Sequence, residues 1–301
     1  MKTWRIGYLA PGAQSADGLP PLALRRALQQ LGYVPGKNVE FLTRFAEAKS
    51  ERLPGLAHEL VASIVDVLVT IGWKATRALE DATSTIPIVF VSAGEPVAAG
   101  LVKTLARPGR NATGISDLSA ELSAKRLDLL LQLVPNARRI AVLWNADDLA
   151  MTLRYREIER AARVLTASIQ ALGVREPEDF DGAFSTMVKD RPDALMLVTD
   201  ALTILNRRHV LEFARQQSLP AMYESGSLVR EGGLVSYGPD FDDMFRRAAI
   251  YIDRILQGAT AGELPVEQPT RYYLLINVTT AKALGLSVPP ALMLRADEIV
   301  Q

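Results

Sequence analysis

Two short apolar runs stand out in the pattern of hydrophobic and polar positions along the chain. They are Val67-Leu68-Val69-Thr70-Ile71 and Ile86-Pro87-Ile88-Val89-Phe90-Val91. Neither run alternates with polar residues, which is typical of strands covered on both faces by the helices of a parallel sheet. Gly72-Trp73-Lys74 follows the first run, and Ser92-Ala93-Gly94-Glu95-Pro96 follows the second. Open α/β sheets bind ligands at the carboxyl ends of their strands, so these two segments are candidate ligand loops, although every such strand also needs a turn here.

The first part of the chain alternates between strand and helix patterns. Leu24, Ala27, Leu28 and Leu31 follow the i, i+3, i+4, i+7 spacing of a helix with one buried face. Ser50 is the predicted N-cap of the next helix. This order of elements predicts a doubly wound α/β sheet. The predicted strands are 5–9, 39–45, 67–71 and 86–91, and the predicted helices are 24–31, 53–64 and 74–82.

The alternation of strand and helix patterns begins again after Ser116 and predicts a second α/β unit of similar layout. A long helix over 241–256 then precedes an extended segment over 272–276, and the chain ends in a Pro289-Pro290 tail. The other strands expected in this part are 139–144, 167–174, 194–199, 221–223 and 234–237, and its other helices include 122–134 and 280–284. Two successive α/β units predict two lobes of like fold.

Composition narrows the functional classes. The chain has 301 residues, too many for one compact core, and 34 Lys and Arg balance 34 Asp and Glu. A neutral chain without a basic block argues against nucleic acid as a partner. No cysteine is present, and the two histidines, His58 and His209, lie far apart in sequence. With no P-loop, nucleophile elbow or dinucleotide fingerprint either, we expect no catalytic residues, no metal and no cofactor.

Several segments along nearly the whole chain resemble the substrate-binding proteins of ABC importers of the tryptophan/tyrosine type. The segments are Gly94-Glu95-Pro96-Val97-Ala98-Ala99-Gly100-Leu101-Val102, Arg107-Pro108-Gly109-Arg110-Asn111-Ala112-Thr113-Gly114, Arg138-Arg139-Ile140-Ala141-Val142-Leu143-Trp144-Asn145, Glu231-Gly232-Gly233-Leu234-Val235-Ser236-Tyr237-Gly238 and Leu264-Pro265-Val266-Glu267-Gln268-Pro269. The resemblance implies a protein that is not an enzyme, export to the periplasm with the export signal absent from the given chain, and an ABC permease as membrane partner. We expect it to act as a monomer.

The resemblance also implies the type I periplasmic binding protein fold. In this fold two Rossmann-like lobes with parallel sheets are joined by three crossover segments, and a small solute binds in the cleft between them. The N-terminal lobe would comprise 1–116 and 239–276, and the C-terminal lobe 117–238 and 277–301. A few residues at the crossovers would absorb the rotation of closure.

The predicted site combines residues that suit an amino acid or another small carboxylate. Backbone N–H groups and hydroxyls would hold the carboxylate, a buried carboxylate the ammonium, and aromatic walls the side chain. Lys74 either pairs with a ligand carboxylate or is a solvated lysine, a strand-end Asp or Ser is as often a helix N-cap as a ligand contact, and Tyr8 belongs either to an aromatic wall or to the core. The ligand-binding candidates are Ala10, Pro11, Gly72, Trp73, Lys74, Ser92, Ala93, Gly94, Glu95, Asn145, Thr199, Asp200, Tyr223, Glu224 and Tyr237.

Three departures from the family's usual pattern leave the solute open. They are Glu95 before a proline, Trp73-Lys74 after the third strand and Glu224 after the strand at 221–223. The aromatic residues favour an amino acid with an aromatic or branched apolar side chain, and a carboxylate among Glu95, Asp200 and Glu224 as its cation anchor. The alternative function is the ligand-sensing effector domain of a regulatory protein, and a Rossmann-type enzyme is the third possibility.

Overall fold

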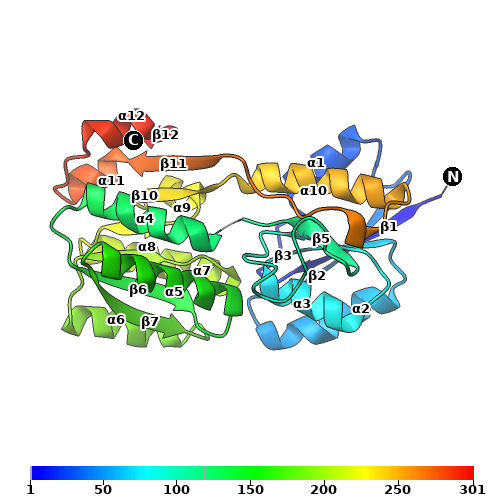
Figure 1. Cartoon of the computed structure of the whole chain (residues 1–301), viewed down its shortest axis with the longest axis horizontal. Helices are drawn as coiled ribbons and strands as arrows, with labels where there is room; N and C mark the ends of the chain where they lie inside the picture. The colour runs from blue at the N-terminus through cyan, green and yellow to red at the C-terminus, as the bar shows by residue number, and fades with distance from the viewer. Residues whose placement is uncertain (1, 118) are drawn as a thin grey trace. The chain divides into compact units, whose positions relative to one another are not determined.

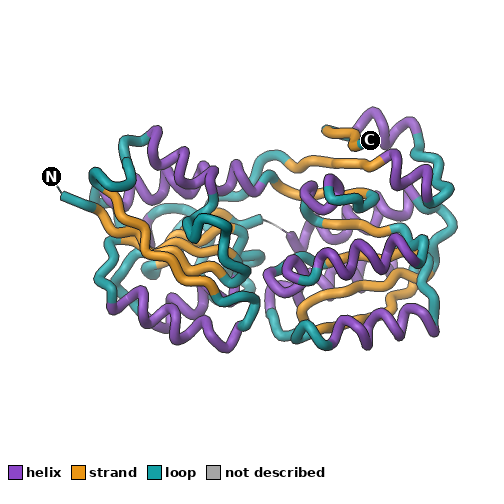
Figure 2. The backbone as a smooth tube through the Cα atoms, turned by 180° about the vertical axis from the view of Figure 1, so that it is seen from behind, coloured by secondary structure: helices purple, strands orange, loops and turns teal. Residues whose placement is uncertain are grey.

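The chain forms two compact units, each built from discontinuous segments. The computed structural model describes residues 2–117 and 119–301. Unit 1 comprises Met1–Leu118 and Phe241–Thr270, and unit 2 comprises Ser119–Asp240 and Arg271–Gln301. The backbone therefore passes three times from one unit to the other. In each unit, strands lie between layers of helices (Figure 2).

Unit 1 has a five-stranded sheet with the order β2-β1-β3-β4-β5, and all its strands are parallel. The strands are β1 (Trp4–Ala10), β2 (Val39–Phe45), β3 (Val67–Ile71), β4 (Ile88–Val91) and β5 (Ala112–Ile115). The helices are α1 (Leu22–Gln30), α2 (Leu53–Ala62), α3 (Trp73–Ala82) and α10 (Phe241–Leu256), with 3-10 turns at Ser50–Arg52 and Ala261–Glu263. This arrangement confirms the predicted doubly wound sheet.

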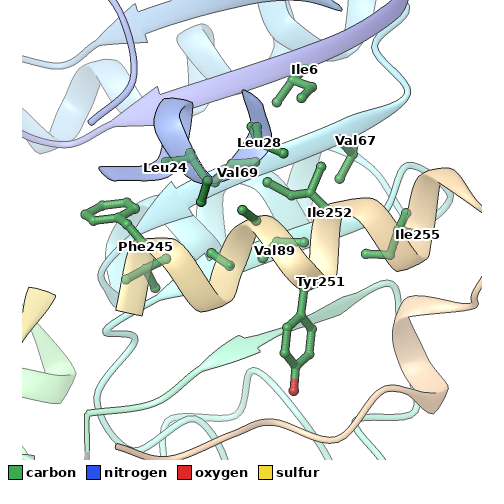
Figure 3. Close-up of a cluster of buried hydrophobic side chains, with 14 of the residues drawn as sticks. Ile6, Leu24, Leu28, Val67, Val69, Val89, Phe245, Tyr251, Ile252 and Ile255 are labelled. Atoms are coloured by element: carbon green, nitrogen blue, oxygen red, sulfur yellow. The ribbon is translucent and has the colours of Figure 1, made fainter. Parts of the chain in front are cut away.

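Helices far apart in sequence cover one face of this sheet together. α10 lies beside α1 (Figure 1). Leu28 of α1 and Ile252 of α10 are fully buried in one cluster with Val69 of β3 and Val89 of β4 (Figure 3). Leu68, which points to the opposite face because side chains alternate along a strand, belongs to a second cluster under α2 and α3.

Unit 2 has a seven-stranded sheet with the order β12-β11-β10-β9-β8-β6-β7. It is parallel except that β11 pairs antiparallel with β10, and β12 then runs parallel to β11. Its strands are β6 (Arg139–Asn145), β7 (Ser168–Val174), β8 (Ala194–Leu197), β9 (Ala221–Tyr223), β10 (Val235–Pro239), β11 (Tyr272–Asn277) and β12 (Glu298–Val300). Its helices are α4 (Ser119–Leu133), α5 (Leu149–Val164), α6 (Asp179–Lys189), α7 (Ala201–Leu205), α8 (Arg207–Gln216), α9 (Gly226–Arg230), α11 (Val278–Ala283) and α12 (Pro290–Arg295).

The structure corrects the sequence prediction in four places. The segment 272–276 lies in unit 2 and not in the N-terminal lobe, because it forms β11 and pairs with β10. Ser50 begins a 3-10 turn before α2 and does not cap that helix. The last residues, expected to form a tail, fold into α12 and β12, and the short strand β5 was not predicted. None of the described helices is long and apolar enough to cross a membrane.

A buried carboxylate in unit 1 makes the stability of the fold depend on pH. The side chain of Glu80, in the last turn of α3, is only 4% exposed, and neither of its oxygens forms a hydrogen bond with a described residue. Burial raises the pKa of Glu80 to about 7, an effect that Asp81 reinforces and that Arg110 and Arg77 oppose. The folded state therefore binds this proton more tightly than the unfolded chain does.

We expect this pKa shift to destabilise the protein as the pH rises from about 4.5 to about 7. Below this range the carboxyl is protonated in both states, and above it the folded state carries the full cost of a buried charge. Glu80→Gln should leave stability unchanged near pH 4 and raise it by up to about 3 kcal/mol at pH 8. Urea unfolding at both pH values measures this difference, with the exposed Glu59→Gln as control. An equal effect of Glu80→Gln at both pH values would contradict the prediction.

Candidate functional site

Three of the predicted site residues, Ala10, Pro11 and Gly72, lie at the carboxyl ends of β1 and β3, where the backbone fixes their positions. The carbonyls of Ala10, the last residue of β1, and of Pro11 accept hydrogen bonds from the amides of Ala46 and Ala48. Gly72 precedes α3 with a φ of 81°, a value that favours glycine. These three positions shape the backbone at this edge of the sheet.

Trp73 and Lys74 open α3, and both side chains are held within unit 1. The indole Nε1 of Trp73 donates a hydrogen bond to the carbonyl of Ala99 at 3.1 Å. The Nζ of Lys74 donates to the hydroxyl of Ser50 at 3.0 Å, and both residues are half-buried. The lysine is thus not a fully solvated cation, and it lies at the helix end where the backbone dipole is positive.

The loop after β4 is fixed by residues that follow the neighbouring strand β5. The register pairs Val91 with Ile115, so the residues after both strands lie side by side. The hydroxyl of Ser92 donates to Asp117 Oδ2 at 2.5 Å, and the hydroxyl of Ser116 donates to the carbonyl of Gly94 at 2.6 Å. Within the same loop, Ala93 is fully buried and Glu95 is half-buried.

Glu224, at the end of β9 in unit 2, lies in a buried ion-pair triad with two arginines. Its Oε1 accepts a hydrogen bond from Arg126 Nη1 of α4 at 2.8 Å, and its Oε2 accepts one from Arg154 Nη1 of α5 at 2.7 Å. The amide of Thr199 donates to the same Oε2 at 3.1 Å. All three charged side chains are at most 6% exposed. This geometry contradicts Glu224 as a cation anchor, since two guanidinium groups already neutralise its carboxylate.

Asp200 and Asn145 connect the ends of β8 and β6. Asp200 is the N-cap of α7, where its Oδ1 accepts from the amide of Thr203 at 2.9 Å in a capping box. Its Oδ2 accepts from Asn145 Nδ2 at 2.6 Å. The structure thus shows the N-cap role for Asp200 that was open from the sequence. It also brings the predicted residues Asn145, Thr199, Asp200 and Glu224 to one edge of the unit 2 sheet.

The predicted aromatic residues fall into two groups. Tyr8 and Tyr223 are 4% and 1% exposed and belong to the hydrophobic clusters inside units 1 and 2, where burial raises the pKa of both phenols above the usual range. Tyr223 was expected to form an aromatic wall, and its place in the core contradicts that role. Tyr237 is half-buried on β10, with its ring centroid 6.1 Å from that of Tyr272.

The sequence prediction missed the residues that hold the site together. Arg126, Arg154, Ser116 and Asp117 were not among the candidates, although each contacts one. A signal was present for Arg154, because it occupies the buried stripe of α5 between Met151 and Ile158. A charged side chain on the apolar face of a helix needs a buried partner, and that requirement marks a candidate. Among the described residues, no group of three or more His, Asp or Glu suits a metal ion.

Two α/β units with polar and aromatic residues at the strand ends define a protein that binds small molecules. Over residues 22–300 the chain matches the ABC transporter substrate binding protein family, so it belongs to that family. It is the extracytoplasmic solute-binding component of an ABC transporter, and the prediction that it is not an enzyme is confirmed by this membership. The family also favours transport over the sensing alternative.

Known relatives support both the family and the fold. A tyrosine-binding protein of Clostridioides difficile (strain R20291) is 28% identical over 262 residues, which cover 87% of this chain and 75% of that protein. A conserved domain protein from Vibrio cholerae is similar with 28% identity and a TM-score of 0.93, covering 99% of this chain and all of the other. An ABC domain from Streptococcus pneumonia in complex with L-Trp has 23% identity and a TM-score of 0.92 over the same shares. The predicted periplasmic binding protein fold is confirmed by these structures.

Proposed function

We propose that this chain binds an amino acid with an aromatic or branched apolar side chain in the periplasm and delivers it as a monomer to an ABC permease. The tyrosine-binding relative, which matches 87% of the chain, is the observation that carries this proposal. The complex of a structural relative with L-Trp supports the same ligand class.

In each unit, the residues proposed to contact the solute lie at the carboxyl ends of its strands. In unit 1, Trp73 supplies an apolar ring that packs against the cluster containing Ala93. The backbone N–H groups of Ala93 and Gly94 suit a carboxylate. Lys74, held by Ser50, adds positive charge near the same helix end. In unit 2, Asn145, Thr199 and Tyr237 supply polar contacts around a sheet edge that the Glu224 triad makes rigid.

Binding of the proposed solute should raise the melting temperature. A ligand that binds only the folded state adds about 2.7 kcal/mol at a hundred times its dissociation constant. At roughly 2–4 °C per kcal/mol, this corresponds to a rise of several degrees. The measurement is a thermal-shift panel of amino acids, aromatic acids and short dicarboxylates on protein refolded from denaturant, because a ligand retained through purification masks every addition.

The compounds that raise the melting temperature should share one type of side chain. Each of them should be recovered unchanged after incubation with the protein. Stabilisation by a nicotinamide or flavin nucleotide alone would contradict the proposal, as would conversion of a bound compound to product. A response confined to dicarboxylates would keep the carrier function and exclude the amino acid.

A further inference from the structure

The hydroxyl of Ser92 has a fixed direction. Its single hydrogen points to Asp117 Oδ2, and the oxygen–oxygen distance of 2.5 Å is that of a short, charge-assisted hydrogen bond. A serine hydroxyl has one hydrogen to donate and two lone pairs to accept with. Because the hydrogen is used, only the lone pairs remain for a solute. None of the described residues donates a hydrogen bond to this oxygen.

Burial makes this direction costly to reverse. Asp117 is 1% exposed and Ser92 is 8% exposed. Rotating the hydroxyl towards a solute would take a hydrogen bond away from a buried carboxylate, which costs more than breaking one in water. The negative charge of Asp117 next to the hydroxyl also repels a solute carboxylate.

The backbone keeps Ser92 in place at the end of β4. Its φ is 53°, in the left-handed region that is rare for residues other than glycine. Such strain persists only where the surroundings impose it, and it is concentrated at ligand sites. Here the surroundings are the residues that follow β5, because Ser116 holds the carbonyl of Gly94 two residues further along the same loop.

Other carboxylates expected as cation anchors have different roles. Glu224 neutralises Arg126 and Arg154, and Asp200 caps α7 and accepts from Asn145. The pair of Ser92 and Asp117 is a further strand-end group, and it combines a hydrogen-bond acceptor with an adjacent carboxylate.

We propose that Asp117 is a positioning residue that makes the Ser92 hydroxyl an acceptor for the ammonium group of the solute. The part of the site next to Ser92 then binds the primary amine of a solute and rejects a carboxylate at that position. This inference rests on the proposed function, since it assigns one functional group of an amino acid to one part of the site. It also corrects the expectation that the Ser92 hydroxyl donates to the solute carboxylate.

The test compares amino acids with the same acids lacking the amine. The probes are L-tryptophan with indole-3-propionate, L-tyrosine with 3-(4-hydroxyphenyl)propionate, and L-leucine with 4-methylpentanoate, titrated calorimetrically into refolded protein. The wild type should bind at least one amino acid on the order of ten- to a hundredfold more tightly than its partner compound. Ser92→Ala and Asp117→Asn should weaken binding of that amino acid about tenfold or more and leave the partner compound unaffected or more tightly bound.

Ser116→Ala is the matched control for a merely structural role. It removes a hydroxyl that holds the same loop through the carbonyl of Gly94 and leaves the side chains of Ser92 and Asp117 unchanged. It should change the affinity of both compounds by the same factor, so the preference for the amine stays. If a single variant fails to fold, the double variant Ser92→Ala/Asp117→Ala removes both partners and leaves no buried carboxylate behind. It should lose the preference in the same way.

Three results would overturn the inference, and they separate it from the proposed function. Equal loss of affinity for both compounds in Ser92→Ala would show that the pair only supports the loop. A wild type that binds the acids without the amine as tightly as the amino acids would exclude an ammonium site while the carrier function stands. A wild type that binds no amino acid of the panel would overturn the proposed ligand class and this inference with it.

Discussion

Glu224→Gln is expected to lower the free energy of unfolding of unit 2 by about 3–5 kcal/mol. The substitution keeps the volume of the side chain but removes the charge that neutralises Arg126 and Arg154, and all three side chains are buried. A buried guanidinium that loses a carboxylate partner is destabilised because protein surroundings solvate it poorly. At roughly 2–4 °C per kcal/mol, the melting temperature should fall by about 6–20 °C.

Tryptophan fluorescence assigns this loss to one unit. Trp4 and Trp73 lie in unit 1 and Trp144 lies in unit 2, so Trp4→Phe/Trp73→Phe leaves a reporter for unit 2 alone. The control is Glu212→Gln, which breaks an exposed ion pair with Arg215 and should have a much smaller effect, because solvent screens an exposed pair. Equal effects of the two glutamine substitutions would show that the triad contributes no more than a surface pair.

Ile252→Ala should destabilise unit 1 by about 2–5 kcal/mol, although Ile252 follows the whole first segment of unit 2 in the chain. The side chain is fully buried between α1 and the sheet (Figure 3), so its removal leaves a cavity in a packed core. Denaturant unfolding in a Trp144→Phe background, in which both remaining tryptophans report on unit 1, measures the change.

Ile250→Ala is the control for Ile252→Ala because it makes the same truncation on the same helix. Ile250 is 51% exposed, and its truncation should alter the stability by less than about 0.5 kcal/mol. If Ile252→Ala lowered the stability of unit 2 and left unit 1 unchanged, α10 would not be part of the unit 1 core.

The fold was predictable where the hydrophobic pattern extends over many residues or forms a continuous apolar run. Helix α10 was predicted with its observed bounds, because the apolar stripe of Met244, Ala248, Ile252 and Ile255 extends over about three turns. Strand β3 was predicted with its exact first and last residues, because its run of apolar residues is not interrupted by charged ones. β11 was placed in the wrong lobe, since its apolar run is compatible with either sheet and only the pairing with β10 decides.

The site was predictable in its location more than in its chemistry. Parallel strands end at one edge of a sheet, so the position of Ser92 after β4 was enough to make it a candidate. Its partner Asp117 follows β5, a short strand with no clear pattern, and the partners of Glu224 come from two helices. Such partners depend on contacts between distant segments, which a single sequence does not encode in its periodicity.

The discontinuity of unit 1 also sets the order in which the nascent chain completes its cores. Leu24 and Ile252 pack in one cluster, yet about 230 residues separate them. At about 5–20 residues per second, ribosomal synthesis takes roughly 10–50 s to reach α10 after β1 has been made. During that time the apolar face of the β1 to β5 sheet has α1 but not α10 to cover it. The growing polypeptide therefore presents an uncovered hydrophobic surface to chaperones until α10 has been made, and long-range contacts of this kind make the closing step slow.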